Sequence, residues 1–101
     1  MDRAIRATLG ALVARMSPEL AERVRRSLPP ALAAHVHGPR FGGALDVAEL
    51  YAHVGELEDV APETAQLHAR AVCGALARSL PRAVLAALRR ELGPEIAATF
   101  G

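Results

Sequence analysis

The chain has no lysine, no asparagine, one cysteine and only three aromatic residues among its 101 residues. A single cysteine excludes an intramolecular disulfide, and the opening MDRAIRATLG lacks the apolar run of a signal peptide. No stretch approaches the roughly 20 apolar residues that a membrane-spanning helix needs. These absences predict a cytoplasmic protein with no membrane segment.

Strand signals are also missing, because valine and isoleucine are sparse and no segment alternates apolar with polar residues. Helix is therefore the only element that the sequence supports. Alanine makes up 22 of the 101 residues, which predicts helices packed closely through small side chains. At this length, we expect a single all-α domain with one modest core.

Prolines, glycines and capping residues divide the chain into a bundle of about six to seven helices. Ser17 and Asp46 are placed as N-caps, and Glu49 would complete a capping box with Asp46. The pairs Pro29-Pro30 and Gly93-Pro94 each predict a sharp corner between two helices. The segment HGPRFGG, at 37–43, is typical of a linker. The expected helices are 2–16, 18–28, 30–35, 46–54, 62–79, 81–92 and 94–100.

The sequence contains an internal repeat. Residues 6–36 align with residues 70–100 without a gap, and 11 of the 31 positions are identical. Several identities are not alanines, so composition alone does not account for them: Gly10/Gly74, Arg25/Arg89, Arg26/Arg90, Leu28/Leu92 and Pro30/Pro94. We predict an internal duplication within the single domain, residues 1–101. Its pseudo-symmetric halves would be 1–36 and 46–101, with a linker at 37–45.

Charge is distributed unevenly along the chain. Residues 1–30 hold six arginines and three acids, and residues 70–101 hold five arginines and two acids. Between them, residues 44–69 hold six acids and no arginine. The net charge of +1 argues against a dedicated nucleic-acid binder, which would need a larger basic excess. The pattern predicts either solvated faces or charge complementarity within the chain or between subunits.

No residue pattern predicts catalysis, a cofactor or a metal. His35 and His37 form an H-x-H, but no Cys, Asp or Glu stands nearby to complete a ligand set. Cys73 lies on an apolar helical face and is expected to be a buried, inert thiol. No serine–histidine–aspartate set, phosphate loop or carboxylate pair is recognisable.

The halves differ in one respect that suggests an interface. A helix containing Leu50 precedes the second half, whereas nothing comparable precedes the first. Either the acidic helix covers both halves, or an apolar groove on the first half receives a helix from another subunit or partner. The second alternative is favoured, as a homodimer. The candidate interface comprises Leu9, Leu12, Leu20, Arg23, Arg25 and Arg26.

The stretches LYAHV, RAVCGAL and LRRELGPEI look like one helical unit, and RATLGAL with RRSLPPAL looks like the rest of another. Together they resemble a bacterial all-helical family catalogued as domain of unknown function 2267. The resemblance implies a small helical fold and brings no catalytic residues.

These observations favour a non-catalytic helical protein-interaction or self-assembly module, with a homodimer or a helical protein as its partner. The alternative is a weak nucleic-acid-associated accessory protein that uses the arginine pairs to contact phosphates. An enzyme is the least favoured class.

Overall fold

The computed structural model describes residues 2–36 and 46–100, and these form seven helices and no strand. The all-α prediction is confirmed, while the expected linker at 37–45 lies outside the described residues. Within the described chain, no helix is both long and apolar enough to cross a membrane. The helices are α1 (Asp2–Val13), α2 (Pro18–Ser27), α3 (Pro30–Ala33), α4 (Val47–Glu58), α5 (Pro62–Ser79), α6 (Arg82–Leu92) and α7 (Pro94–Thr99).

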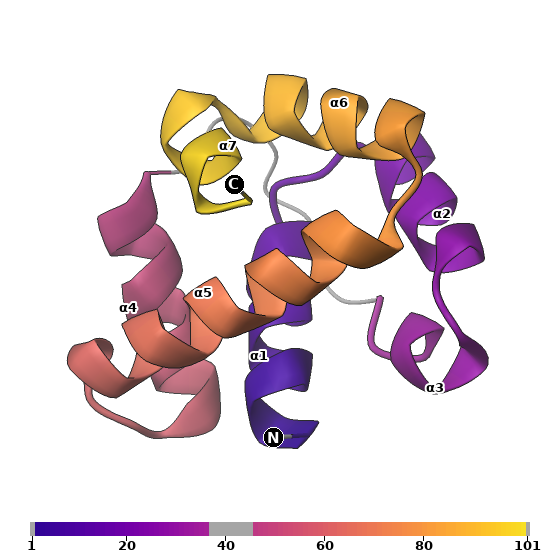
Figure 1. The fold of residues 1–101 in the computed structure, drawn as a ribbon. Coiled ribbons are helices and arrows are strands. Elements are labelled where there is room, and N and C mark those ends of the chain that lie inside the picture. The colour runs from indigo at the N-terminus through magenta and orange to yellow at the C-terminus, as the bar shows by residue number, and fades with distance from the viewer. Residues whose placement is uncertain (1, 37–45, 101) are drawn as a thin grey trace.

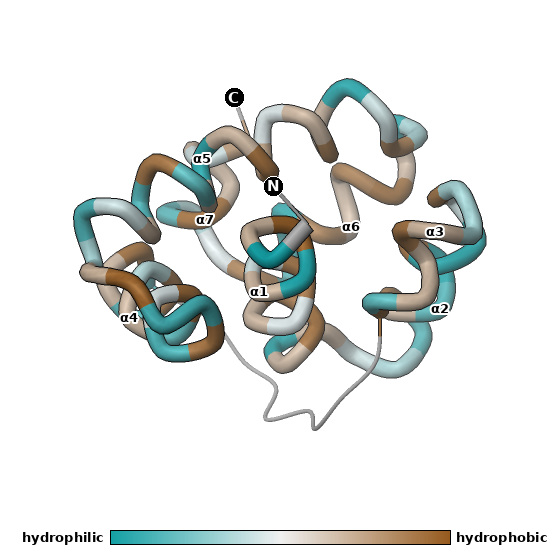
Figure 2. Tube along the Cα trace, turned by 90° about the horizontal axis from the view of Figure 1, so that it is seen from below, coloured by the Kyte–Doolittle hydropathy of each residue, from teal (hydrophilic) through white to brown (hydrophobic). Residues whose placement is uncertain are grey.

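Helix α1 lies at the centre of the molecule, with α4 on one side and α2–α3 on the other (Figures 1 and 2). Helix α5 crosses in front of α1, and α6 with α7 closes the top in the view of Figure 1. The acidic helix α4 packs against both α1 and α5. Of the two alternatives left open by the sequence, the described chain therefore adopts the first, in which one acidic helix covers both halves.

The core is built from leucines and valines with small residues between the helices, as the alanine content predicts. Ala65 and Ala69 of α5 are fully buried. A Cβ placed on Gly55 of α4 would lie 3.6 Å from the Cβ of Ala65. Small side chains thus let α4 and α5 approach closely.

The predicted caps are formed, with one difference. The backbone N–H of Leu20 donates to Ser17 Oγ at 3.2 Å, and that of Glu49 donates to Asp46 Oδ1 at 2.7 Å. The Glu49 carboxylate, expected to close a capping box, instead accepts from Arg15 at 3.1 Å. The predicted end of the fourth helix near Val54 is wrong, because α4 continues to Glu58 and ends at a left-handed residue, Asp59 (φ 60°).

The two helix corners reach similar extended ψ values by different chemistry. Pro29 has φ −57° and ψ 152°, whereas Gly93 has φ 91° and ψ 171°. The Gly93 conformation is essentially restricted to glycine because a Cβ would clash with the backbone. Both corners that the repeat predicts are therefore present.

The helices of the two halves keep the register of the repeat. Helices α2 and α6 begin at 18 and 82, and α3 and α7 begin at 30 and 94, which is the same offset in both cases. The aligned pairs Leu20/Val84, Val24/Leu88 and Leu28/Leu92 are buried. The duplication itself stays a prediction, since it requires that the two halves superpose.

Two glutamates near the C-terminal end of the chain accept hydrogen bonds from the N-termini of other helices. Glu91 accepts from the backbone N–H of Ser17 at 2.7 Å and from its Oγ at 2.8 Å, next to the start of α2. Glu95 accepts from the backbone N–H of Val47 at 3.1 Å, at the start of α4. Carboxylates at these positions satisfy donors that lack intrahelical partners.

Candidate functional site

An apolar groove lies between α1, α5 and the corner that joins α2 to α3. It is partly open to solvent and has a volume of about 140 Å³. The groove is lined by Ile5, Leu9, Leu28, Leu32, Ala71, Val72, Ala75, Leu76 and Ser79.

Short side chains and a short helix account for the opening. Ala71 and Ala75 are exposed on the α5 wall, where larger residues would fill the space. On the opposite wall, α3 is a single turn and Leu32 is only half-buried. Its counterpart in the repeat, Ile96, is fully buried on the longer helix α7. The first half thus covers its apolar surface less completely at this position.

The groove lining offers no polar group to orient a small substrate. Ser79 is the one polar residue in it, and its Oγ already donates to the backbone oxygen of Ala75 at 2.9 Å. Dry apolar cavities of roughly 150 Å³ accept groups the size of a benzene ring. The lining therefore suits an apolar side chain rather than a reacting molecule.

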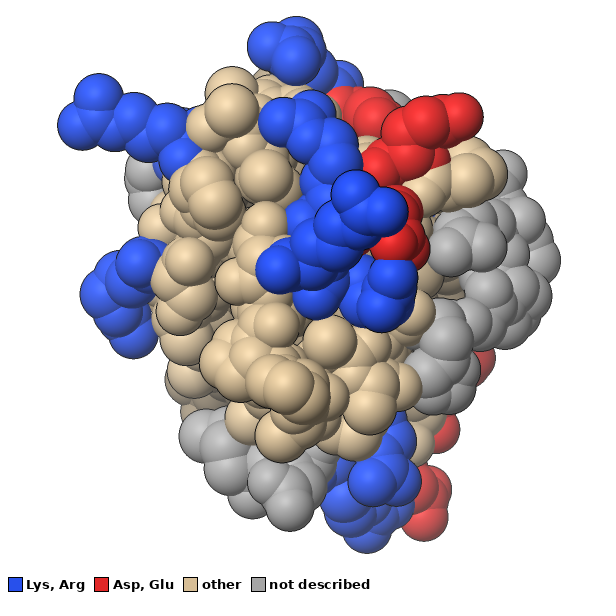
Figure 3. All heavy atoms as spheres, turned by 90° about the vertical axis from the view of Figure 1, so that its right-hand side faces the viewer, with Lys and Arg blue, Asp and Glu red and all other residues tan. Residues whose placement is uncertain are grey.

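The charged residues that lie closest in sequence to this lining are all arginines. Within two sequence positions of a lining residue, the only charged residues are Arg3, Arg6, Arg26, Arg70 and Arg78. Figure 3 views the face that carries α2 and α3. Arginine side chains lie across its middle and at its margins, and acidic side chains lie beside the central arginines and at the lower right. Arg3 donates to the Glu58 backbone oxygen and Arg26 is paired with Glu22, so the uncompensated positive charge beside the lining comes from Arg6, Arg70 and Arg78.

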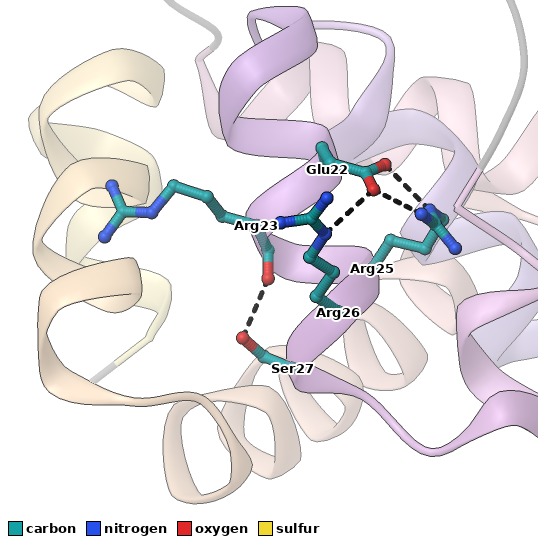
Figure 4. A network of polar contacts seen from close by, with 5 residues as sticks. All are labelled: Glu22, Arg23, Arg25, Arg26 and Ser27. Carbon is teal, nitrogen blue, oxygen red and sulfur yellow. Dashed lines mark hydrogen bonds and ion pairs between the residues drawn. The ribbon is translucent and has the colours of Figure 1, made fainter.

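The three arginines predicted as interface residues lie on α2 and are exposed (Figure 4). Glu22 accepts from Arg25 Nε at 2.8 Å and from Arg26 Nε at 3.1 Å. The hydrogen bond from Arg25 lowers the pKa of Glu22, and the same pairing raises the pKa of Arg25. Arg23 points away from this cluster. Glu22 thus offsets part of the positive charge of α2.

The three leucines of the predicted interface are not accessible. Leu9 and Leu12 are 0% exposed and Leu20 is 2% exposed, so the expectation that they form an open groove is wrong. Leu9 and Leu12 are covered because α4 and α5 pack against α1, and Leu20 lies on α2, which packs against α6. Leu9 still forms part of the floor of the observed groove, whereas Leu12 and Leu20 belong to the core.

The predicted burial of Cys73 is confirmed, because the residue is 0% exposed. Loss of hydration raises the pKa of this thiol to about 12. His35 lies half-buried after α3, and His37 lies outside the described residues. In the described part of the chain, no group of three or more His, Cys, Asp or Glu residues is arranged to hold a metal ion.

A polar pair of a buried glutamate and a half-buried histidine was not predicted from the sequence. Glu58 Oε1 lies 2.7 Å from His68 Nδ1, and the Glu58 backbone oxygen accepts from Arg3 at 2.7 Å. Glu58 is 5% exposed. These contacts tie α4 to α5 and α1.

Sequence reasoning also missed most of the groove, including Ile5, Leu32 and Ala75. The sequence did carry one sign of the groove. The apolar residues of α5 are too many to lie all on its buried face, so some of them must be exposed. Leu67 is 70% exposed, and Ala71 and Ala75 follow it at four-residue intervals. Such spacing places all three on one outward side of the helix.

A model of the family described as "Uncharacterized conserved protein (DUF2267)" matches residues 2–99. No curated protein and no solved structure matches the chain.

Proposed function

The chain belongs to the DUF2267 family, and we propose that this member is a non-catalytic helical module for protein interaction or self-assembly. The observation that carries the proposal is the apolar groove with arginines around it. Its shape and lining suit the apolar side chains of a helix, and its rim favours acidic residues flanking those side chains. The partner is a helical protein or a second copy of the chain.

Two further features support a role in binding rather than catalysis. The thiol of Cys73 is buried, and its pKa of about 12 keeps it protonated at neutral pH. The lining of the groove provides no acid, base or nucleophile apart from Ser79, whose hydroxyl bonds to its own helix. The groove can therefore bind an apolar surface, but its lining carries no group suited to catalysis.

A synthetic amphipathic helix with a leucine stripe flanked by glutamates tests the proposal. Added to isotope-labelled protein, it should shift the NMR methyl signals of Ile5, Leu9 and Leu32, which line the groove. Ala75→Leu should weaken binding by about ten-fold or more, since the longer side chain occupies the groove. Ala86→Leu, at an exposed alanine of α6, is the matched control and should bind normally.

A version of the peptide with lysines in place of the glutamates should bind more weakly, because the rim is positive. Shifts confined to other surfaces, or binding that Ala75→Leu leaves unchanged, would contradict the proposal.

The alternative function is weak association with nucleic acid, which the exposed arginines of α2 favour. Two observations weigh against it: Glu22 pairs with Arg25 and Arg26, and the described aromatic residues, Tyr51 and Phe100, are half-buried and buried, so neither offers an open stacking face. Titration with a DNA or RNA duplex at two salt concentrations separates the functions. Phosphate contacts predict binding that falls steeply with added salt.

We also propose a cytoplasmic location. A single buried cysteine in the thiol form fits a reducing compartment.

A further inference from the structure

The outward side of α5 combines an exposed leucine, small residues and opposite charges. Leu67 is 70% exposed, which is the largest value among the large hydrophobic residues described. Ala71 and Ala75 follow it at intervals of four. Arg78 lies over the same side, because its Nη1 would be 3.6 Å from a Cβ placed on Gly74. In Figure 1, α5 crosses the front of the molecule with no other helix before it.

The charges of this side change sign along the helix. Glu63 is exposed in the first turn, one turn before Leu67, and Arg70 and Arg78 are exposed further along. An antiparallel copy of the same helix therefore presents its acidic end to the basic end of the first. This is the symmetry of a two-fold interface, in which one patch is complementary to itself.

We propose, on the basis of the proposed function, that the occupant of the groove is a second copy of this chain. The two α5 helices pair antiparallel about a two-fold axis between positions 70 and 71, so that Arg70 of each copy faces Ala71 of the other at the edge of the contact. In that register, position 67 faces position 74 of the other copy, and position 63 faces position 78. Leu67 of each copy then lies against Gly74 of the other, next to Ala75, which lines the groove.

Small side chains make this pairing possible. Ala71, Gly74 and Ala75 occupy the crossing, so the two backbones can approach without a clash. Leu67 supplies the buried apolar anchor on each side, and anchors of this kind carry most of the affinity of an interface. The facing Glu63 and Arg78 set the register and steer encounter more than they add affinity, because both remain near the rim.

Substitution of the anchor tests the proposal in the full chain. Sedimentation of the wild type at micromolar to submillimolar concentrations should show a monomer–dimer equilibrium. Leu67→Arg should raise the dimer Kd by about ten-fold or more, since it places a further cation against the arginines of the other copy. Leu57→Arg is the matched control, because Leu57 is also exposed (52%) but lies on α4, and it should leave the Kd unchanged.

A charge exchange tests the register. Glu63→Arg and Arg78→Glu should each weaken the dimer several-fold, and the double variant should restore it, because both facing pairs regain opposite charges. Circular dichroism should show unchanged helix content in all three, since both residues are exposed.

Crosslinking tests the two-fold axis. Ala71→Cys should form a disulfide between copies under mild oxidation, whereas Ala86→Cys on α6 should not; native Cys73 is buried and does not interfere. A wild type that stays monomeric throughout the concentration range would overturn this inference but not the proposed function, which the acidic peptide tests separately. A dimer that survives Leu67→Arg and is not trapped through Ala71→Cys would overturn the α5 pairing while leaving self-assembly in place.

Discussion

At the scale of single residues, burial decides what each side chain can do. Cys73 and Leu67 lie on the same helix, yet the first is 0% and the second 70% exposed. The cysteine is consequently a packing group with a thiol that resists ionisation, whereas the leucine is available for contact. Leu12 was predicted to be an interface residue, but its complete burial makes it a core residue. Leu12→Glu should therefore unfold the protein rather than only separate two copies.

The Cys73 thiol should make stability depend on pH in alkaline solution. Its pKa rises from 9.0 to about 12 on burial, so between these values the folded state binds more protons than the unfolded state. The stabilising contribution is complete below pH 9 and is lost as pH rises toward 12. Between pH 8 and pH 10, the wild type should lose about 1.4 kcal/mol more unfolding free energy than Cys73→Ala, as measured by urea denaturation. Equal losses in the two proteins would contradict this prediction.

At the scale of elements, several helices begin or end at one identifiable residue. Each such residue can be substituted without changing the rest of its helix. Ser17 and Asp46 cap α2 and α4 with their side chains, and α4 ends at Asp59 in a left-handed conformation. Between α6 and α7 this residue is Gly93, with its positive φ. Each of these residues acts on the backbone within a few positions, so most of these helix ends were predicted from the sequence.

Gly93→Ala should destabilise the fold by about 1–3 kcal/mol, because a Cβ is strained at φ 91° and ψ 171°. Gly10→Ala is the matched control. Gly10 lies within α1, and an added Cβ would meet Leu57 Cδ1 at an ordinary 3.7 Å. That variant should gain about 0.5–1 kcal/mol from helix propensity. Thermal unfolding of the two variants should therefore move in opposite directions; a Gly93→Ala protein as stable as the wild type would show that the corner relaxes.

At the scale of the whole molecule, charge and packing place the acidic helix between two basic segments. Helix α4 contacts α1 and α5, and Glu49 of α4 pairs with Arg15 at 3.1 Å, just beyond the end of α1. The helix thus covers the apolar surface of both halves, and the resulting molecule measures 32 × 28 × 25 Å. Among the described residues, a smaller groove beside α3 stays open.

The internal duplication belongs to this scale. We expect the Cα atoms of residues 6–36 to superpose on those of residues 70–100 in an experimental structure, because the helix starts share one offset and aligned apolar residues are buried in both halves. The largest deviation should occur at α3, which is shorter than α7. Opposite crossing directions of the helices in the two segments would end the duplication argument.

The sequence alone determined the order and approximate starts of the helices, both corners and the burial of Cys73, but not the end of the fourth helix. Proline, glycine and capping side chains act on the backbone within one turn, and apolar spacing identifies the face that each helix must bury. Only the tertiary structure decided that α4 and α5 both pack against α1, that Glu58 meets His68, and that Ala71 and Ala75 leave a groove on α5. The exposure of an apolar face depends on which other helix packs against it. That choice is made by the combined packing of all the helices, so no local pattern encodes it.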